Sequence, residues 1–277
     1  MSLPLVSIGV PFFNNSKTIA KLIENLLDQD YQHTEIILSD NCSTDDSKVK
    51  IQKFLSNKKI RYFRNDTNMG AIFNHNVLID YAKGKYFMWA HTDDLISKNY
   101  INDAVSILEN DNDISSVIGK MTFFETNKTQ IFHDEPQNLN VRKFERIKNF
   151  IETSFSDSLI MGLHRSSILV KKRYIMSPEI PFIFNLLLNG KIQGCPSIKY
   201  FKYNQIERTM KEKIQHYKYK NLIFGRFAWY FISIIEILKS DLKINEKINL
   251  VIKFKLYNLP LLRNFFKKKS LNSFLKK

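Results

Sequence analysis

The stretch KYFMWAHTDD, residues 85–94, decides how the first half of the chain is interpreted. An apolar and aromatic run ends there in two adjacent carboxylates, Asp93 and Asp94. Such a run predicts a buried strand, and an open α/β sheet binds its ligands at the carboxyl ends of its strands. Carboxylate oxygens suit Mg²⁺ or Mn²⁺, whereas a solvated turn before the next helix is the alternative interpretation.

The residues before this stretch alternate between predicted strands and predicted helices. Strands are expected at 5–12, 35–39 and 59–63, with helical patterns between them and over 71–83. This alternation predicts a parallel sheet with helices on both faces. Polar pairs follow three of the strands: Asn14-Asn15, Asp40-Asn41 and Asp93-Asp94. Because parallel strands end at one edge of the sheet, these pairs are expected to converge on one ligand.

The pattern is less regular after residue 94. A helix is predicted over 99–109, a strand over 114–124, a hairpin and loop over 126–140, and a helix over 141–151. Pro178 marks the start of another helix, which Asn189-Gly190 ends.

Composition indicates a globular protein kept in a reducing compartment. The 277 residues are 44% hydrophobic and 13% aromatic, and the two cysteines, Cys42 and Cys195, form no disulfide framework. No basic leader opens the chain, and the best candidate for a membrane span, 222–238, is interrupted by Arg226 and Glu236. We therefore expect a cytoplasmic protein.

The positive charge is concentrated in the C-terminal quarter. Of the net +15, residues 201–277 hold 18 Lys or Arg against 5 Asp or Glu. We therefore divide the chain into a domain over 1–205 and a basic, aromatic-rich helical region over 206–277. That region suits an anionic membrane surface, although an ordinary helical subdomain with solvated lysines is equally consistent. No nucleic-acid-binding signature accompanies the charge, so a nucleic-acid partner is not expected.

An ordered set of segments carries a resemblance to a known family. These are VSIGVPFFNN (6–15), EIILSDNCSTDDS (35–47), RYFRNDTNMGAIFNHN (61–76), GKYFMWAHTDDLI (84–96), GLHRSS (162–167) and the segment from Glu179 to Gly190. In this order they resemble the family 2 glycosyltransferases. The resemblance implies an α/β GT-A fold, which is Rossmann-like with a mostly parallel central sheet and helices on both faces, here with a C-terminal helical extension.

The resemblance also implies a set of nucleotide contacts. They would come from Pro11, Phe12, Asn14, Asp40, Asn68, Gly70 and Asp93. Asp40 would accept a hydrogen bond from a ring N–H, which uracil and thymine both offer. Two of these residues have simpler explanations, since Asp40 could cap a turn and Gly70 could serve a turn alone.

The metal ligands implied by the resemblance are Asp93 and Asp94, which would hold Mn²⁺ or Mg²⁺. This chain departs from the family pattern because His91 replaces the first aspartate. His91 is either an extra ligand or a packed or solvated histidine. His164 and Arg165 are candidates for contacts to donor or acceptor, and a surface arginine at a helix start is the alternative.

The catalytic base implied by the resemblance is Glu179, where the family usually has Asp. A first-turn helix acid is the alternative explanation, and Glu207 and Asp157 are weaker candidates for the base. The implied reaction is inverting transfer of a sugar from a nucleotide-sugar, with a UDP-sugar preferred, to a glycan or lipid-linked acceptor. Family analogy suggests bacterial surface polysaccharide synthesis, such as lipopolysaccharide or capsule, at the cytoplasmic face of the inner membrane.

Two other functions compete with this one. Departures at His91 and Glu179 are compatible with an inactive relative that serves as a partner subunit. A nucleotidyltransferase would share the sheet and the metal, but it would carry a Gly-rich basic loop after the first strand, and residues 11–15 are not such a loop.

Overall fold

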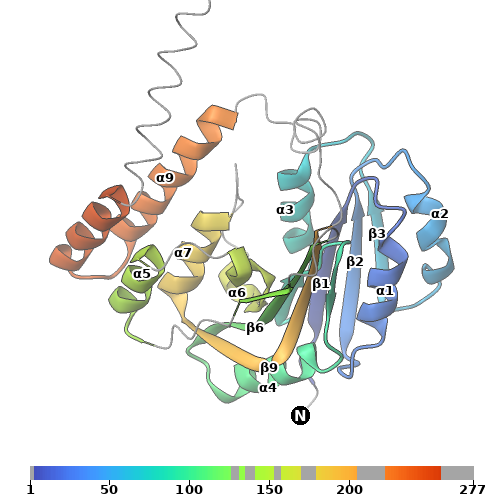
Figure 1. Cartoon of the computed structure of the whole chain (residues 1–277), viewed down its shortest axis with the longest axis horizontal. Coiled ribbons are helices and arrows are strands. Elements are labelled where there is room, and N and C mark those ends of the chain that lie inside the picture. The colour runs from blue at the N-terminus through green and yellow to red at the C-terminus, as the bar shows by residue number, and fades with distance from the viewer. Residues whose placement is uncertain are drawn as a thin grey trace, which may run out of the picture.

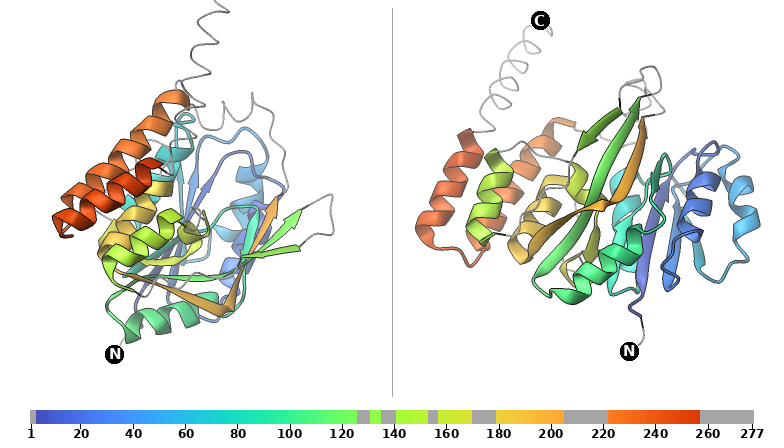
Figure 2. Two further views of the ribbon diagram at one scale, coloured as in Figure 1. Left: turned by 60° about the vertical axis from the view of Figure 1, so that its left-hand side comes forward. Right: turned by 60° about the horizontal axis from the view of Figure 1, so that its bottom comes forward.

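The structure is a computed structural model that describes residues 3–125, 131–134, 141–152, 157–169, 179–204 and 222–256. Helices cover both sides of a twisted central sheet, as Figures 1 and 2 show. The first half contains β1 (Val6–Phe12), α1 (Ile19–Leu27), β2 (Thr34–Asp40), α2 (Ser47–Ile51), η1 (Gln52–Phe54), β3 (Ile60–Arg64), α3 (Ala71–Tyr81) and β4 (Tyr86–Trp89). Each of these elements lies within a few residues of its predicted position.

The second half adds short strands and helices around two long strands. It contains β5 (Asp94–Ile96), α4 (Tyr100–Asn110), β6 (Ile114–Glu125), β7 (Ile131–Asp134), α5 (Lys143–Glu152), η2 (Asp157–Met161), β8 (Leu163–Arg165), α6 (Ser166–Leu169), α7 (Glu179–Asn189), β9 (Lys191–Asn204) and α9 (Leu222–Lys239), followed by a helix over 244–256.

The sheet has a parallel half and a mixed half. Its strand order is β3-β2-β1-β4-β8-β6-β9-β5, with β7 paired to β6. Strands β3, β2, β1 and β4 are parallel, as predicted. The pairs β4–β8, β6–β8, β6–β7 and β5–β9 are antiparallel, whereas β6–β9 is parallel. The sheet is thus more mixed than the sequence predicted. Each antiparallel pair includes at least one strand that lies after residue 90.

Strand β9 is the largest element that the sequence did not predict. Gly194 and Pro196 lie inside it, and both residues ordinarily argue against a strand. The ladder to β6 is irregular at this point, since Gly119 pairs with Cys195 and Lys120 pairs with Lys199. Pro196 therefore lies where the regular pairing is interrupted, and its missing N–H costs no ladder hydrogen bond.

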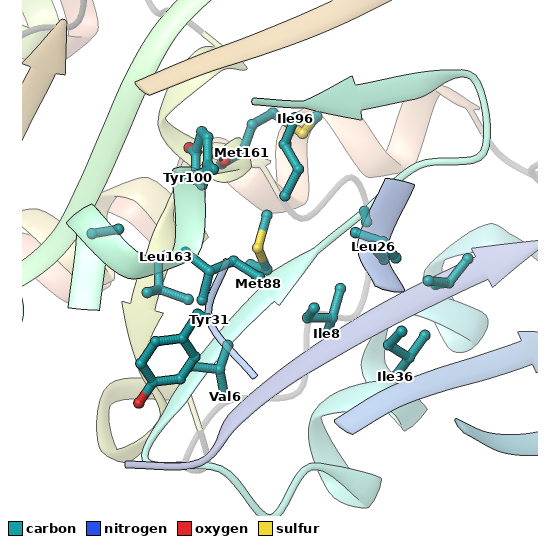
Figure 3. Packing of buried hydrophobic residues seen from close by; sticks show 14 of the residues in the cluster. Val6, Ile8, Leu26, Tyr31, Ile36, Met88, Ile96, Tyr100, Met161 and Leu163 are labelled. Carbon is teal, nitrogen blue, oxygen red and sulfur yellow. Dashed lines mark hydrogen bonds between the residues drawn. The ribbon is translucent and has the colours of Figure 1, made fainter. Parts of the chain in front are cut away.

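Apolar side chains fill both faces of the parallel strands. β1, β2 and β4 are buried along their whole length, as expected for strands covered by helices on both sides. Figure 3 shows Ile8, Ile36 and Met88 from these three strands packed near Leu26 of α1. On the opposite face Gly9 allows α3 close approach, because a Cβ there would lie 2.9 Å from Phe87 and 3.1 Å from Leu78.

The C-terminal helices pack on the sheet domain through a shared core. The ring of Phe254 stacks on Tyr230 of α9 at 5.3 Å between centroids and meets Phe184 of α7 edge-on at 5.2 Å. Ion pairs join the same region, from Lys143 of α5 to Asp241 and from Lys253 to Glu152. The predicted domain boundary near 205 falls among residues outside the described part. Among the described helices, none combines the length and apolar character needed to cross a bilayer.

Candidate functional site

The loops that follow β1, β2, β3 and β4 leave the sheet from one edge. Backbone hydrogen bonds continue past the strand ends, from Asn41 N to Phe12 O, from Asn65 N to Asp40 O and from Ala90 N to Gly9 O, each at 2.9 Å. The polar pairs that follow the strands are therefore held at the same edge. The predicted common edge is thus confirmed, whereas the convergence of the three pairs on one ligand stays a prediction.

Asp40 is completely buried, and its carboxylate already accepts three hydrogen bonds. Oδ1 accepts from Ser43 N at 2.7 Å, and Oδ2 accepts from the Tyr62 hydroxyl at 3.0 Å and from the Arg64 guanidinium. Burial and the Asp40 charge raise the pKa of Tyr62. With about four acceptor positions on a carboxylate, Oδ1 keeps one for a base N–H. Asp40 therefore anchors the turn and the neighbouring strand, whatever it contributes to a nucleotide.

The loop after β1 meets the loop after β2 through Asn14. This residue has a φ of 56°, and its side-chain Oδ1 accepts from Thr44 N at 2.8 Å. Its own N–H donates to Ser43 Oγ at 3.0 Å. Pro11 and Phe12 are buried, and the Phe12 side chain belongs to the core, so only their backbone can contact a ligand. Of the three predicted residues here, only Asn14 has an exposed side chain.

The loop before α3 is tied to the same edge through Asn41. Its Nδ2 donates to Asn68 Oδ1 at 2.9 Å, and its Oδ1 accepts from Met69 N at 2.8 Å. Gly70 N donates to Asn68 Oδ1 at 2.9 Å. Gly70 has a φ of 87°, a conformation that only glycine adopts without strain, so the turn itself requires a glycine here.

Asn74 is another amide at this edge, and the sequence did not single it out. It is buried on α3, where its Oδ1 accepts from Ser39 Oγ at 2.6 Å and its Nδ2 donates to Ser39 O at 2.9 Å. It therefore fixes the end of β2 against α3. Asn74 stands inside the quoted segment 61–76, and a polar residue in a predicted helix was the signal available.

The carboxylate of Asp94 is buried. It begins β5, which pairs with β9, so no solvated turn leads from the two aspartates straight into a helix. Its Oδ2 accepts from the Tyr200 hydroxyl at 2.8 Å, whereas its Oδ1 is buried without a hydrogen-bond partner. Tyr200 was missed because β9 was missed.

Asp93 is partly buried, and its carboxyl resists ionisation. Burial raises its pKa first, and the neighbouring Asp94 charge raises it further, whereas His91 and Lys202 lower it. Among the described residues no group of three or more His, Cys, Asp or Glu is arranged to hold a metal.

His91 is a packed member of a histidine pair. Its Nε2 lies 3.2 Å from His75 Nε2, and its Nδ1 lies 3.6 Å from Asp94 Oδ2. His75 Nδ1 lies 2.8 Å from Ala71 O, so it carries the proton there, and its Nε2 then accepts a hydrogen bond from His91. His91 is thereby oriented between α3 and the buried carboxylate.

The first turn of α7 lies against the end of β4. The Trp89 ring meets Phe182 of α7 at 5.2 Å between centroids, and its Nε1–H donates to His75 O at 3.3 Å. Because Phe182 is three residues after Glu179, the backbone at Glu179 is brought toward the same edge. The side chain of Glu179 and all of Glu207 lie outside the described residues, and Asp157 opens η2.

His164 is buried inside the fold and not presented to a ligand. It packs against Trp89 and Phe182, and its Nε2–H donates to Ile160 O at 3.0 Å. Its Nδ1 is buried without a partner. Burial lowers its pKa to about 4, so the ring is neutral. The expected donor or acceptor contact of His164 is therefore corrected to a packing role.

Arg165 lies at the opposite end of β4 from the two aspartates. It pairs in register with Tyr86, the first residue of that strand. Its guanidinium donates to the carbonyls of Ile114, Leu108 and Asp111. The expected contact of Arg165 with the sugar donor or acceptor is corrected as well. Its N–H groups are already hydrogen-bonded to backbone carbonyls, far from the strand-end cluster.

Comparison with known proteins identifies the class that this fold and edge cluster define. The family model described as "Glycosyl transferase family 2" matches residues 7–176, more than half of the chain. The chain therefore belongs to the family 2 glycosyltransferases.

Solved structures agree on the fold. The crystal structure of S. aureus TarS 1-349 in complex with UDP-GlcNAc superposes with a TM-score of 0.70 at 19% identity, covering 92% of this chain and 72% of that chain. The crystal structure of S. aureus TarS 1-349 gives a TM-score of 0.68 at 18% identity, covering 94% of this chain and 73% of that chain. The fold is GT-A, as the resemblance implied.

Curated relatives match part of the chain. Glycosyltransferase GlyG of Streptococcus pneumoniae is 34% identical over 117 residues, which is 42% of this chain and 38% of that protein. The UDP-Glc:alpha-D-GlcNAc-diphosphoundecaprenol beta-1,3-glucosyltransferase WfgD of Escherichia coli is 28% identical over 139 residues, which is 50% of this chain and 54% of that protein. The matches thus span little more than half of these relatives at most.

Proposed function

We propose that this chain transfers a sugar from a UDP-sugar to a hydroxyl of a glycan or lipid-linked acceptor, with inversion, in bacterial surface polysaccharide synthesis. Family membership supports the reaction class. The names of two relatives support the donor, since TarS has a structure with UDP-GlcNAc and WfgD is named for UDP-Glc. WfgD is also named for a diphosphoundecaprenol-linked acceptor. A lipid-linked acceptor would bring the enzyme to the cytoplasmic face of the membrane.

The observation that carries this proposal is the pair of aspartates at the end of β4. Asp94 Oδ1 is buried without a partner, and Asp93 has its pKa raised by burial and by its neighbour. A divalent cation fits both features, because it supplies the missing partner and relieves the repulsion between two carboxylates. Mg²⁺ and Mn²⁺ are commonly held by one or two carboxylates, with substrate phosphates completing the shell. When bound, the cation neutralises charge on the departing nucleoside diphosphate.

The protein itself supplies a catalytic base and holds the nucleotide-sugar donor in place. We propose that the Glu179 carboxylate removes the proton from the acceptor hydroxyl while its oxygen bonds to the anomeric carbon and the bond to the diphosphate oxygen breaks. The placement of α7 beside Trp89 supports this assignment. The remaining acceptor position on Asp40 Oδ1 suits the N3–H of uracil.

A thermal-shift panel tests the donor site. UDP, dTDP, GDP, CDP and CMP are each added with and without Mn²⁺. A ligand at ~100 times its dissociation constant stabilises a protein by about 2.7 kcal/mol, which the scan resolves. We expect a metal-dependent shift with UDP that Asp93→Asn removes. Asp28→Asn is the matched control, because Asp28 is an exposed acid in the loop that follows α1.

Two results would contradict the proposal. A thermal shift of equal size with and without Mn²⁺ would exclude a cation at this site. The absence of a shift with every nucleotide would exclude a nucleotide-sugar as the donor. Turnover of UDP-sugars with a lipid-diphosphate glycan acceptor, followed by NMR of the product, then gives the anomeric outcome. A retained configuration would exclude a single displacement.

A further inference from the structure

We propose that the two C-terminal helices form a docking surface for an anionic lipid bilayer. This inference goes beyond the proposed reaction and does not depend on it. The surface consists of apolar side chains that stay exposed on α9 and on the helix 244–256, and we call it the outer face. Its members are Phe231, Ile235 and Leu238 on α9, and Ile244, Ile248 and Ile252 on the second helix.

The outer face is distinct from the side of these helices that packs on the protein. Inward, Tyr230, Ile237, Leu250 and Phe254 are buried in the core shared with α7. On the second helix, Ile244, Ile248 and Ile252 follow one another at intervals of four residues and form one exposed row. The buried Leu250 and Phe254 lie on another side of the helix. Ile244 is 76% exposed, more than any other large apolar side chain in the described part. The helices are thus already folded and packed without using these side chains.

The charges beside the outer face are mostly positive. Lys239, Lys243 and Lys255 are exposed on the two helices or in the turn that joins them. Two acids near this turn have partners, since Asp241 pairs with Lys143 and the Glu246 carboxylate of the second helix accepts from the backbone of residue 243. In sequence, residues 257–277 add six Lys or Arg and no Asp or Glu directly after the second helix. Apolar side chains among lysines are therefore the chemistry that this end of the chain offers.

An anionic bilayer is the partner that satisfies both properties. Its acyl region buries aliphatic and aromatic side chains, and its head groups attract lysines at roughly 1 kcal/mol each. A nucleic acid offers phosphates but little surface that would bury a row of isoleucines. A second copy of the chain would bring the same positive charge to the contact, which opposes association. The outer face therefore fits a lipid surface best.

Vesicle flotation with the full-length protein tests the inference. The probes are phosphatidylcholine vesicles and phosphatidylcholine vesicles with about one third phosphatidylglycerol. We expect flotation with the anionic vesicles, weakened by salt. The triple variant Ile244→Ser, Ile248→Ser and Ile252→Ser should lower the partition coefficient more than about tenfold, because three apolar side chains lose their burial. Val49→Ser, which changes a 71% exposed valine on α2, is the matched control and should float like the wild type.

Folding and assembly are measured on the same proteins. Because the substituted side chains are exposed, near-UV circular dichroism and the UDP thermal shift should stay unchanged in the triple variant. Equal flotation of the triple variant and the wild type, or no flotation of the wild type, would overturn the inference. A dimer of the wild type that the triple variant abolishes in sedimentation velocity would assign the outer face to a second copy and would also overturn it.

Discussion

Acidification should destabilise this protein through His164, a histidine that the fold buries as a neutral ring. The pKa of His164 falls from its ordinary 6.5 to about 4 because it is buried. Its Nε2–H donates to Ile160 O. Its Nδ1 has no hydrogen-bond partner, so a proton added there would find no acceptor. Protonation in the folded state would therefore place an unpaired charge in the core.

The sign of the effect follows from the two pKa values. Between pH 6.5 and pH 4 the unfolded chain binds a proton at His164 that the folded chain does not bind, so stability rises with pH in this window. The stability that the folded protein gains by keeping His164 neutral is fully present above pH 6.5 and is lost as the pH falls toward 4. From the two values the loss at pH 5 is about 2 kcal/mol relative to pH 8. Each further pH unit would cost about 1.4 kcal/mol at most.

Urea unfolding of matched variants measures this loss. His164→Gln keeps a side-chain N–H for Ile160 O but cannot titrate, so it should lose about 2 kcal/mol less than the wild type between pH 8 and pH 5. His33→Gln changes an exposed histidine and should behave like the wild type. The comparison requires the same m-value for all three proteins. Equal losses for the wild type and His164→Gln would refute the burial of a neutral ring.

Three substitutions probe the site itself. Tyr200→Phe removes the hydroxyl that donates to Asp94, so it should lower the free energy of unfolding by about 2 kcal/mol in urea melts. It should also weaken Mn²⁺-dependent UDP binding in calorimetry. Unchanged values in both measurements would exclude the anchoring role of Tyr200. Gly70→Ala forces a Cβ into a φ of 87° and should cost about 1 kcal/mol, and a thermal melt equal to the wild type would contradict the strain. Glu179→Gln should nearly abolish turnover while the dissociation constant for UDP stays unchanged; most of the turnover surviving would exclude this base.

The parallel half of the sheet could be predicted because its signals are local. β1, β2 and β4 are continuous apolar runs that end in polar pairs, and such runs are typical of strands buried on both faces. The convergence of those polar pairs follows from parallel pairing alone. The loops around Asp40 and Gly70 were placed correctly for the same reason.

The remainder depends on tertiary contacts that a sequence does not display. β5 is three residues long and exists through its pairing with β9, whose Gly194 and Pro196 conceal it. His164 and Arg165 were expected at the site because they lie in the GLHRSS segment that carries part of the resemblance. Their actual neighbours come from β4, α4 and α7, so their burial could not be inferred from local composition.

The hydrogen bond from Tyr200 to Asp94 has a consequence for the order in which the molecule is assembled. The two residues are 106 positions apart, and β5 has its ladder partner in β9. The strands that carry the loops after β1, β2 and β4 can pair once residue 90 has been synthesised. The Asp94 carboxylate at the start of β5 is anchored only when the ribosome has passed residue 200. Emerging chains would therefore acquire the nucleotide-side loops early and the anchored Asp94 late. A long-range closure of this kind is slow to form, and it postpones a complete site until most of the domain is present.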